Sequence, residues 1–142
     1  AALSGTGIRV YAVEKNPEAV SLICQNRKKF RADGIRVVSG KAPEALEDLE
    51  APTHVFIGGS AGNLKDILRT VLDRSPEARI IVNAISLETV SEAMEAAEEG
   101  LLKDPQITQI MASRSRKLGR YHMMTGQNPV YIISAGGRSD VV

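Results

Sequence analysis

Short apolar runs and amphipathic helical patterns alternate along most of this chain, and this alternation limits the folds that it can adopt. Runs typical of β-strands occupy residues 10–13, 35–38, 53–57 and 79–82. Patterns typical of helices follow them at residues 17–31, 43–49, 63–72 and 87–102. Strands that alternate with helices in this way form a mainly parallel sheet with helices on both faces. We therefore predict an α/β fold with a doubly wound sheet.

The pattern changes after residue 105. Residues 106–112 and 130–134 favour strands, and the polar segment 113–129 between them has no helical pattern. We expect these last two strands to pair antiparallel as a hairpin with a long loop. A Rossmann dehydrogenase would continue with strand–helix units instead. A terminal antiparallel hairpin is typical of the Rossmann-like class I S-adenosylmethionine-dependent methyltransferases.

Composition narrows the class of protein. The 142 residues suit a single domain, 1–142, with a sizeable core. The net charge of +1 and the scarcity of aromatic residues argue against a nucleic-acid partner. No apolar run is long enough to span a bilayer, so no membrane partner is expected. The single cysteine, Cys24, falls in a helical pattern and is expected to be buried or half-buried, which suits a reducing, cytoplasmic location.

Glu14 ends the first apolar run and directly precedes a turn. In an open α/β sheet, nucleotide-like ligands bind at the carboxyl ends of parallel strands, where an acid can accept hydrogen bonds from both ribose hydroxyls. Glu14 is therefore a candidate ligand of an adenosine-containing cofactor. A helix-capping or solvated acid at a strand end explains this segment equally well.

Two glycine-containing loops follow the second and third predicted strands. In the first, Gly40 permits close approach of a ligand to the backbone, or an ordinary turn into the next helix. In the second, Gly58 and Gly59 leave room for a ligand, and the amides of the helix that follows could bind a carboxylate. A flexible turn is the alternative there. The second loop does not fit the known phosphate-binding patterns.

Polar residues near the remaining strands complete the candidate site. Asn83, directly after the fourth predicted strand, could orient a polar group of a substrate or cap the following helix, for which Ser86 is the stronger candidate. Residues 114–120 carry four cations, which suit the carboxylates of an acidic small molecule. A solvated hairpin loop or a subunit contact would also explain them. His122 is the better histidine for substrate contact, and His54 is interpreted as structural. No spacing of histidine and cysteine indicates a metal site.

Taken together, these segments resemble the decarboxylating precorrin-6Y methyltransferase of cobalamin biosynthesis, which occurs as a separate subunit or as the C-terminal half of a fused enzyme. The resemblance covers nearly the whole chain. It is carried by these stretches: Val10-Tyr-Ala-Val-Glu-Lys-Asn-Pro17, Gly40-Lys-Ala-Pro-Glu-Ala-Leu46, Val55-Phe-Ile-Gly-Gly-Ser60, Ile81-Val-Asn-Ala84, Ser113-Arg-Ser-Arg-Lys-Leu-Gly119, Tyr121-His-Met and Gln127-Asn-Pro-Val-Tyr-Ile-Ile133.

One part of the family pattern is not found. The family begins with a strand ending in a glycine-rich loop, roughly Asp-x-Gly-x-Gly-x-Gly, which holds the methionine part of S-adenosylmethionine. Gly5-Thr6-Gly7 is no substitute, because it lies just before the second family strand. We therefore expect an N-terminally truncated domain in which strands 10–13 and 53–57 lose their shared neighbour. We also expect this fragment to bind the cofactor poorly by itself.

The resemblance implies methyl transfer from S-adenosylmethionine to a precorrin tetrapyrrole, coupled to decarboxylation of an acetate side chain. It implies a cofactor site in which Glu14 holds the ribose. The other residues of that site would border the adenine or line the cofactor floor: Gly40, Lys41, Ala42, Gly58 and Gly59. The substrate would be contacted by polar and basic residues: Asn83, Arg114, Arg116, Lys117 and His122. No residue stands out as a general base.

The resemblance also implies a homotetramer in which the late hairpin contributes to subunit contacts, so part of the basic loop would serve assembly. Two other functions fit the residues. One is a different small-molecule class I methyltransferase, with RNA disfavoured as substrate by the balanced charge. The other is a nucleotide-binding or assembly module without catalysis, which the missing first strand favours.

Overall fold

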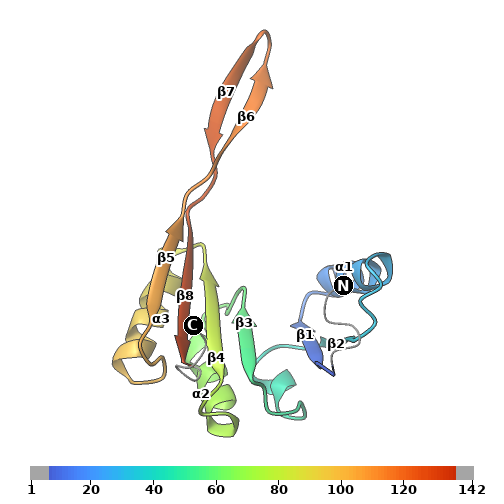
Figure 1. Ribbon diagram of the computed structural model, residues 1–142, viewed down its shortest axis with the longest axis vertical. Coiled ribbons are helices and arrows are strands. Elements are labelled where there is room, and N and C mark those ends of the chain that lie inside the picture. Colours follow the sequence, from blue (N-terminus) through green and yellow to red (C-terminus); the bar gives the residue numbers. More distant parts are fainter. Residues whose placement is uncertain (1–6, 137–142) are drawn as a thin grey trace. The chain divides into compact units, whose positions relative to one another are not determined.

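The computed structural model describes residues 7–136 and divides the chain into two compact units, Ala1–Glu50 and Ala51–Val142 (Figure 1). Strands and helices alternate in both units, as predicted. Gly5 and Thr6, which the sequence argued were no substitute for a glycine-rich loop, lie outside the described residues. Among the residues that are described, no helix is long and apolar enough to cross a membrane.

The first unit contains a pair of parallel strands and the helix that connects them. Its elements are, in order, β1 (Val10–Glu14), α1 (Pro17–Lys29), β2 (Ile35–Ser39) and the short 3-10 helix η1 (Glu44–Leu46). The parallel register places Glu14 opposite Ser39, so both strands end at the same edge. The second of the four predicted helical segments was too long: residues 43–49 form only the single turn η1.

Helix α1 begins and ends where local chemistry requires. The Asn16 side chain accepts a hydrogen bond from the Glu18 backbone N–H at 2.9 Å, and Pro17 occupies the first turn, as predicted. The helix ends at Lys29, two residues earlier than expected. Arg31 adopts a positive φ of 52°, which a continuing right-handed helix cannot accommodate.

The second unit is a four-stranded sheet with two helices. Its first elements are β3 (His54–Ile57), α2 (Leu64–Arg74), β4 (Arg79–Ala84), α3 (Leu87–Glu98) and β5 (Gln106–Ile110), and the last strand of the sheet is β8 (Val130–Gly136). The strand order is β3-β4-β8-β5. Strands β3 and β4 are parallel, and β8 is antiparallel to both of its neighbours. The carboxyl ends of β3, β4 and β5 therefore lie at one edge, the upper one in Figure 1.

The core of the second unit lies between the sheet and the two helices. Helix α2 buries residues spaced at i, i+3, i+4 and i+7, as its pattern predicted. Alternate residues of β4 are buried because successive side chains of a strand point to opposite faces. The buried apolar residues on these elements are Leu64, Ile67, Leu68, Val71, Ile80, Val82, Ala84, Ala93, Ala96, Ile133 and Ala135. Helix α3 ends four residues earlier than expected, just before Gly100, whose φ is +79°.

The antiparallel pairing of β5 with β8 confirms the predicted terminal hairpin. Its long loop is itself a two-stranded antiparallel ribbon of β6 (Ser113–Leu118) and β7 (Tyr121–Gly126), which we call the arm. The turn of the arm contains Gly119, whose φ of +60° favours glycine. Every residue of β6 and β7 is exposed, and the arm projects beyond the sheet (Figure 1).

Within residues 7–136, β1 pairs only with β2, and β3 pairs with β4 but not with β1. Among the described residues, the two strands therefore have no hydrogen-bonded neighbour in common. Strand β1 belongs to the two-stranded sheet of the first unit, and β3 is an edge strand of the four-stranded sheet of the second unit.

Candidate functional site

In the first unit, two of the predicted cofactor-binding residues meet at the carboxyl ends of β1 and β2. Glu14 is the last residue of β1, and Gly40 follows β2 directly. The Gly40 N–H donates a hydrogen bond to the Glu14 carbonyl oxygen at 3.0 Å. Lys41 and Ala42 continue from this point, so the structure brings these four residues together at one strand edge.

The Glu14 side chain is oriented by the turn that follows it. Its Oε1 atom accepts a hydrogen bond from the Asn16 backbone N–H at 2.8 Å, and no described residue donates to Oε2. The alternative that Glu14 caps the helix is not what this bond shows, because the cap of α1 is the Asn16 side chain. This bond also holds the carboxylate at the edge, with one oxygen unengaged by the described residues.

Gly40 has a structural reason to be glycine as well. A Cβ atom built on Gly40 would lie 2.8 Å from the Ala45 Cβ atom, well inside van der Waals contact. The first turn of η1 therefore packs against the bare backbone of the loop. The Ala45 N–H donates to the Lys41 carbonyl oxygen at 2.9 Å, which closes the turn.

We predict that Gly40→Ala destabilises the first unit by about 1–3 kcal/mol, because the added methyl group overpacks the contact with Ala45. Urea unfolding measures the change. Gly59→Ala is the matched control, since a Cβ atom there meets no atom within 4 Å. Combining Gly40→Ala with Ala45→Gly restores the lost space and part of the stability. An equal cost for Gly40→Ala and Gly59→Ala would contradict this packing account.

In the second unit, the glycine pair and Asn83 lie at the carboxyl edge of the sheet. Ile57, the last residue of β3, pairs with Val82 of β4, so Gly58 and Asn83 come next on neighbouring strands. Gly59 faces open space where a side chain would be, which leaves room for a ligand against the backbone.

Asn83 carries a buried acceptor without a partner. Its Oδ1 atom is shielded from solvent and accepts no hydrogen bond from the described residues, whereas nearly all buried polar atoms in proteins are paired. Asn83 does not cap the next helix. Ser86 does so, accepting a hydrogen bond from the Thr89 N–H at 3.3 Å, as the sequence favoured. The side chain of Asn83 is therefore available for another role.

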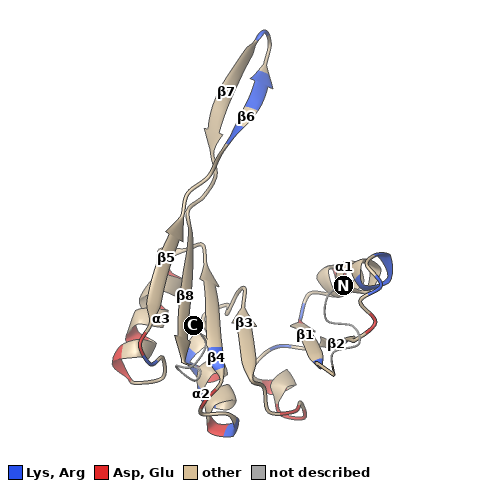
Figure 2. Cartoon of the chain, viewed as in Figure 1, with Lys and Arg blue, Asp and Glu red and all other residues tan. Residues whose placement is uncertain are grey.

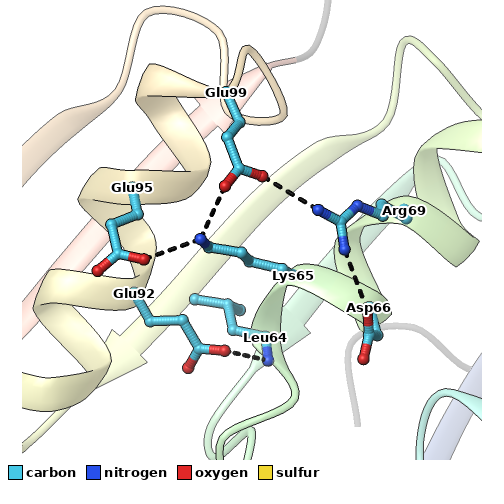
Figure 3. A network of polar contacts seen from close by, with 7 residues as sticks. All are labelled: Leu64, Lys65, Asp66, Arg69, Glu92, Glu95 and Glu99. Carbon is cyan, nitrogen blue, oxygen red and sulfur yellow. Dashed lines mark hydrogen bonds and ion pairs between the residues drawn. The ribbon is translucent and has the colours of Figure 1, made fainter.

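Sequence reasoning missed Glu92, a residue of α3. Its Oε1 atom accepts a hydrogen bond from the Leu64 backbone N–H at 2.8 Å, at the first turn of α2 (Figure 3). The sequence suggested that these helix amides could bind the carboxylate of a ligand. In the structure, the chain's own carboxylate takes that place. The available signal was the spacing of three glutamates, 92, 95 and 99, along one face of the helix.

The other two glutamates of that face hold basic residues of α2 (Figure 3). Lys65 Nζ lies 2.8 Å from carboxylate oxygens of both Glu95 and Glu99, and Arg69 lies 3.1 Å from Glu99. Hydrogen bonds to Glu95 and Glu99 raise the pKa of Lys65 above its ordinary value. The hydrogen bond from Lys65 lowers the pKa of Glu99, which outweighs the opposing effect of desolvation.

We predict a pH dependence of stability from this pair. The lowered pKa of Glu99 means that its contribution is present above the ordinary value of 4.5 and is lost as the pH falls through the lower folded-state value. The raised pKa of Lys65 means that its contribution is complete below 10.5 and is lost above it. Urea midpoints of Glu99→Gln should therefore fall less steeply than those of the parent below pH 4.5. High salt should reduce the difference, because the groups are partly exposed. The control is Glu98→Gln, because Glu98 is an exposed neighbour that forms no ion pair with described residues. If Glu98→Gln changes the pH dependence of the urea midpoint as much as Glu99→Gln does, the prediction is contradicted.

The predicted basic substrate residues all lie on the arm but do not share a face. Lys117 pairs with His122 across the ribbon, so these two point to one side. Arg114 and Arg116 alternate with Lys117 along β6 and point to the other side. Figure 2 shows the basic residues of the arm on β6 and at the turn. The four residues therefore form two small clusters rather than one patch.

The remaining candidates occupy unremarkable positions. His54 is exposed at the start of β3, with its Nδ1 atom 3.1 Å from the Thr53 hydroxyl. Cys24 is half-buried in α1, as predicted. In the described part of the chain, no group of three or more histidine, cysteine, aspartate or glutamate residues is placed to hold a metal ion.

Residues 2–136 match the profile of the precorrin methyltransferase domain. The chain is also 40% identical, over 136 residues, to a probable cobalt-precorrin-6B C(15)-methyltransferase (decarboxylating) from Pyrobaculum calidifontis, a match that covers 95% of this chain and 69% of that protein. The chain belongs to the precorrin methyltransferase family. The resemblance identified from the sequence is thereby confirmed.

Superposition on solved structures identifies the fold class of this precorrin methyltransferase. It superimposes on precorrin 8W decarboxylase from Methanobacterium thermoautotrophicum with a TM-score of 0.80 at 42% identity, covering 90% of this chain and 69% of that one. An S-adenosylmethionine-dependent O-methyltransferase from Thermotoga maritima gives a TM-score of 0.67 at 11% identity, covering 97% and 53% of the two chains, and supports the fold alone. The fold is that of the class I methyltransferases, as predicted, and family and fold together imply use of S-adenosylmethionine.

Proposed function

We propose that this chain is the catalytic domain, in whole or in part, of a decarboxylating precorrin C-methyltransferase of cobalamin biosynthesis. The observation that carries this is the meeting of Glu14 and the Gly40 loop at the ends of two adjacent parallel strands. In this fold class, that edge binds the adenosine part of a cofactor. The names of the relatives supply the substrate class. We also propose that residues 1–142 belong to one domain and that the protein is located in the cytoplasm.

The residues present fit S-adenosylmethionine. The Glu14 carboxylate, held by the Asn16 N–H, offers an acceptor for the ribose hydroxyls. Lys41 and Ala42 follow the close turn at Gly40 and border the adenine. We propose that Gly58 and Gly59, in the second unit, contact the cofactor, because the backbone at Gly59 faces open space.

When bound, S-adenosylmethionine supplies an electrophilic methyl group on a sulfonium. The chain's contribution is to align that group with the acceptor carbon and to exclude water, an effect that can be worth several kcal/mol. We propose that the Asn83 side chain, whose Oδ1 atom has no hydrogen-bond partner among the described residues, orients a polar group of the substrate. The macrocycle accepts the electron pair released with carbon dioxide, so the chain needs no covalent nucleophile.

A precorrin carries several carboxylates, and the arm supplies cations for them. Arg114 and Arg116 on one face, or Lys117 and His122 on the other, bind these groups through charge-assisted hydrogen bonds. Because the two pairs point in opposite directions, one face is left for a different contact.

We propose that this other contact is with further copies of the chain, in a homotetramer. An isolated two-stranded ribbon is marginally stable in water, and the face of this one that carries Arg114 and Arg116 exposes three large apolar side chains: Leu118, Tyr121 and Met123. Leu118→Ser combined with Tyr121→Ser changes one cross-strand pair. We expect it to lower the molar mass measured by light scattering. Ser115→Ala, on the same strand, is the control, and an unchanged mass of the double variant would contradict assembly through this pair.

The test of the function has two stages. S-adenosylhomocysteine is titrated calorimetrically into this chain and into a version that carries the glycine-rich first strand of a relative. The version that binds is then supplied with labelled S-adenosylmethionine and a precorrin. Methyl incorporation with release of carbon dioxide supports the proposal. Methylation of other acceptors only would favour a different small-molecule methyltransferase, and binding to neither version would favour a module without catalysis.

A further inference from the structure

The loop between β3 and α2, residues 58–63, is held in an unfavourable conformation. Ala61 and Gly62 have consecutive positive φ values of 51° and 79°. Alanine has no side chain that could compensate for this conformation by hydrogen bonding, so contacts elsewhere must maintain it. The loop closes on itself through one bond, from the Asn63 N–H to the Ser60 carbonyl oxygen at 3.0 Å.

The end of this loop lacks its own cap. Asn63 precedes α2, but its side chain makes no capping hydrogen bond. The first backbone N–H groups of a helix need acceptors from outside the helix. Glu92 meets this need from α3: its Oε1 atom accepts from the Leu64 N–H at 2.8 Å, and its Oε2 atom lies 3.5 Å from the Ser60 hydroxyl. Ser60 is only 6% exposed and Glu92 is half-buried, so this contact is partly shielded from solvent.

We propose that Glu92 is a positioning residue for the cofactor floor. By joining the buried Ser60 to the first amide of α2, it fixes the loop that carries Gly58 and Gly59. It also occupies the amino end of α2, so a ligand carboxylate does not bind there and the cofactor lies over the glycine pair. This inference rests on the proposed function, because it assigns Glu92 a role in the same site.

The neighbouring glutamates show that this role is specific. Glu95 and Glu99 lie on the same face of α3 but contact only the side chains of Lys65 and Arg69 (Figure 3). They join the two helices without touching the loop. Glu95→Ala therefore removes a contact between the same two helices that does not involve the loop, and it is the matched control for Glu92.

The first measurement is amide hydrogen exchange across residues 58–64 in Glu92→Ala, Glu92→Gln and Glu95→Ala. Glu92→Ala should speed exchange in this segment roughly tenfold, as expected for loss of one hydrogen bond to a charged acceptor, while β4 and β8 keep their protection. Glu92→Gln keeps an acceptor oxygen and should restore part of the protection. Glu95→Ala should leave the segment unchanged. If residues 58–64 of Glu92→Ala exchange as slowly as those of the parent, the inference is overturned. This measurement needs no cofactor.

The second measurement is the affinity for S-adenosylhomocysteine. It is made on this chain or on the version that carries a relative's first strand, depending on which of the two binds. Glu92→Ala should weaken binding roughly tenfold, with partial rescue by Glu92→Gln and no effect of Glu95→Ala. Faster loop exchange with unchanged affinity would overturn the positioning role and leave the proposed function intact. If neither the parent chain nor its extended version binds S-adenosylhomocysteine, the proposed function is rejected. The role of Glu92 in the cofactor site is then rejected with it.

Discussion

Glu14→Ala lowers the affinity for S-adenosylhomocysteine by about 100-fold, the largest effect on binding that we expect. Two hydrogen bonds from ribose hydroxyls to a carboxylate contribute this much when both are lost. The Asn16 N–H holds the carboxylate at the end of β1 by a 2.8 Å bond, so little conformational freedom is lost when the ribose binds. Calorimetric titration of the form that binds the cofactor measures the change.

Glu18→Ala is the control for this prediction. Glu18 is an exposed acid in the first turn of α1, four residues from Glu14, and its side chain forms no hydrogen bond or ion pair with a described residue. Glu14→Gln removes the charge but keeps an acceptor oxygen at the same position. We expect its affinity for S-adenosylhomocysteine to lie between those of the parent and Glu14→Ala. If Glu14→Ala and Glu18→Ala bind equally well, Glu14 is only a residue of the turn, and the ribose assignment is wrong.

Leu68→Ala produces the largest loss of stability that we expect, about 2–5 kcal/mol in the free energy of unfolding. Leu68 lies on α2 and is 0% exposed, so its replacement removes apolar contacts and leaves a cavity. Urea unfolding followed by circular dichroism measures the loss. Leu87→Ala provides the comparison, since Leu87 is 71% exposed and its truncation should change stability little. Similar losses for both variants would contradict the assignment of α2 to the core.

Most secondary structure could be predicted because it follows from local chemistry. Asn16 and Pro17 mark the start of α1, and Ser86 marks the start of α3, whatever surrounds them. Helix ends were less predictable. Helix α1 ends because Arg31 adopts a positive φ, and an arginine in the sequence does not indicate such a conformation. Strand β4 extends to Ala84, two residues beyond its apolar run, because its pairing with β8 continues through Tyr131.

The candidate site was predicted in part. Glu14 and Gly40 were expected together because the ends of parallel strands meet at one edge, and the register confirms it. The arm was expected as a loop, since β6 alternates polar and basic residues and shows no apolar face. Its strand character comes from pairing with β7 around Gly119. The division of its basic residues between two faces could not be known before that register was known.

Periodicity, turn residues and capping side chains were sufficient to indicate the order of strands and helices and the class of fold, and the family was indicated by the resemblance of short motifs. These signals are local, because they depend on the geometry of a few consecutive residues. The partner of the α2 amino end, the packing of Ala45 against Gly40 and the unpaired oxygen of Asn83 became apparent only in three dimensions. Each depends on atoms from segments brought together by the sheet and its helices, and the spacing of residues along a chain does not report such contacts.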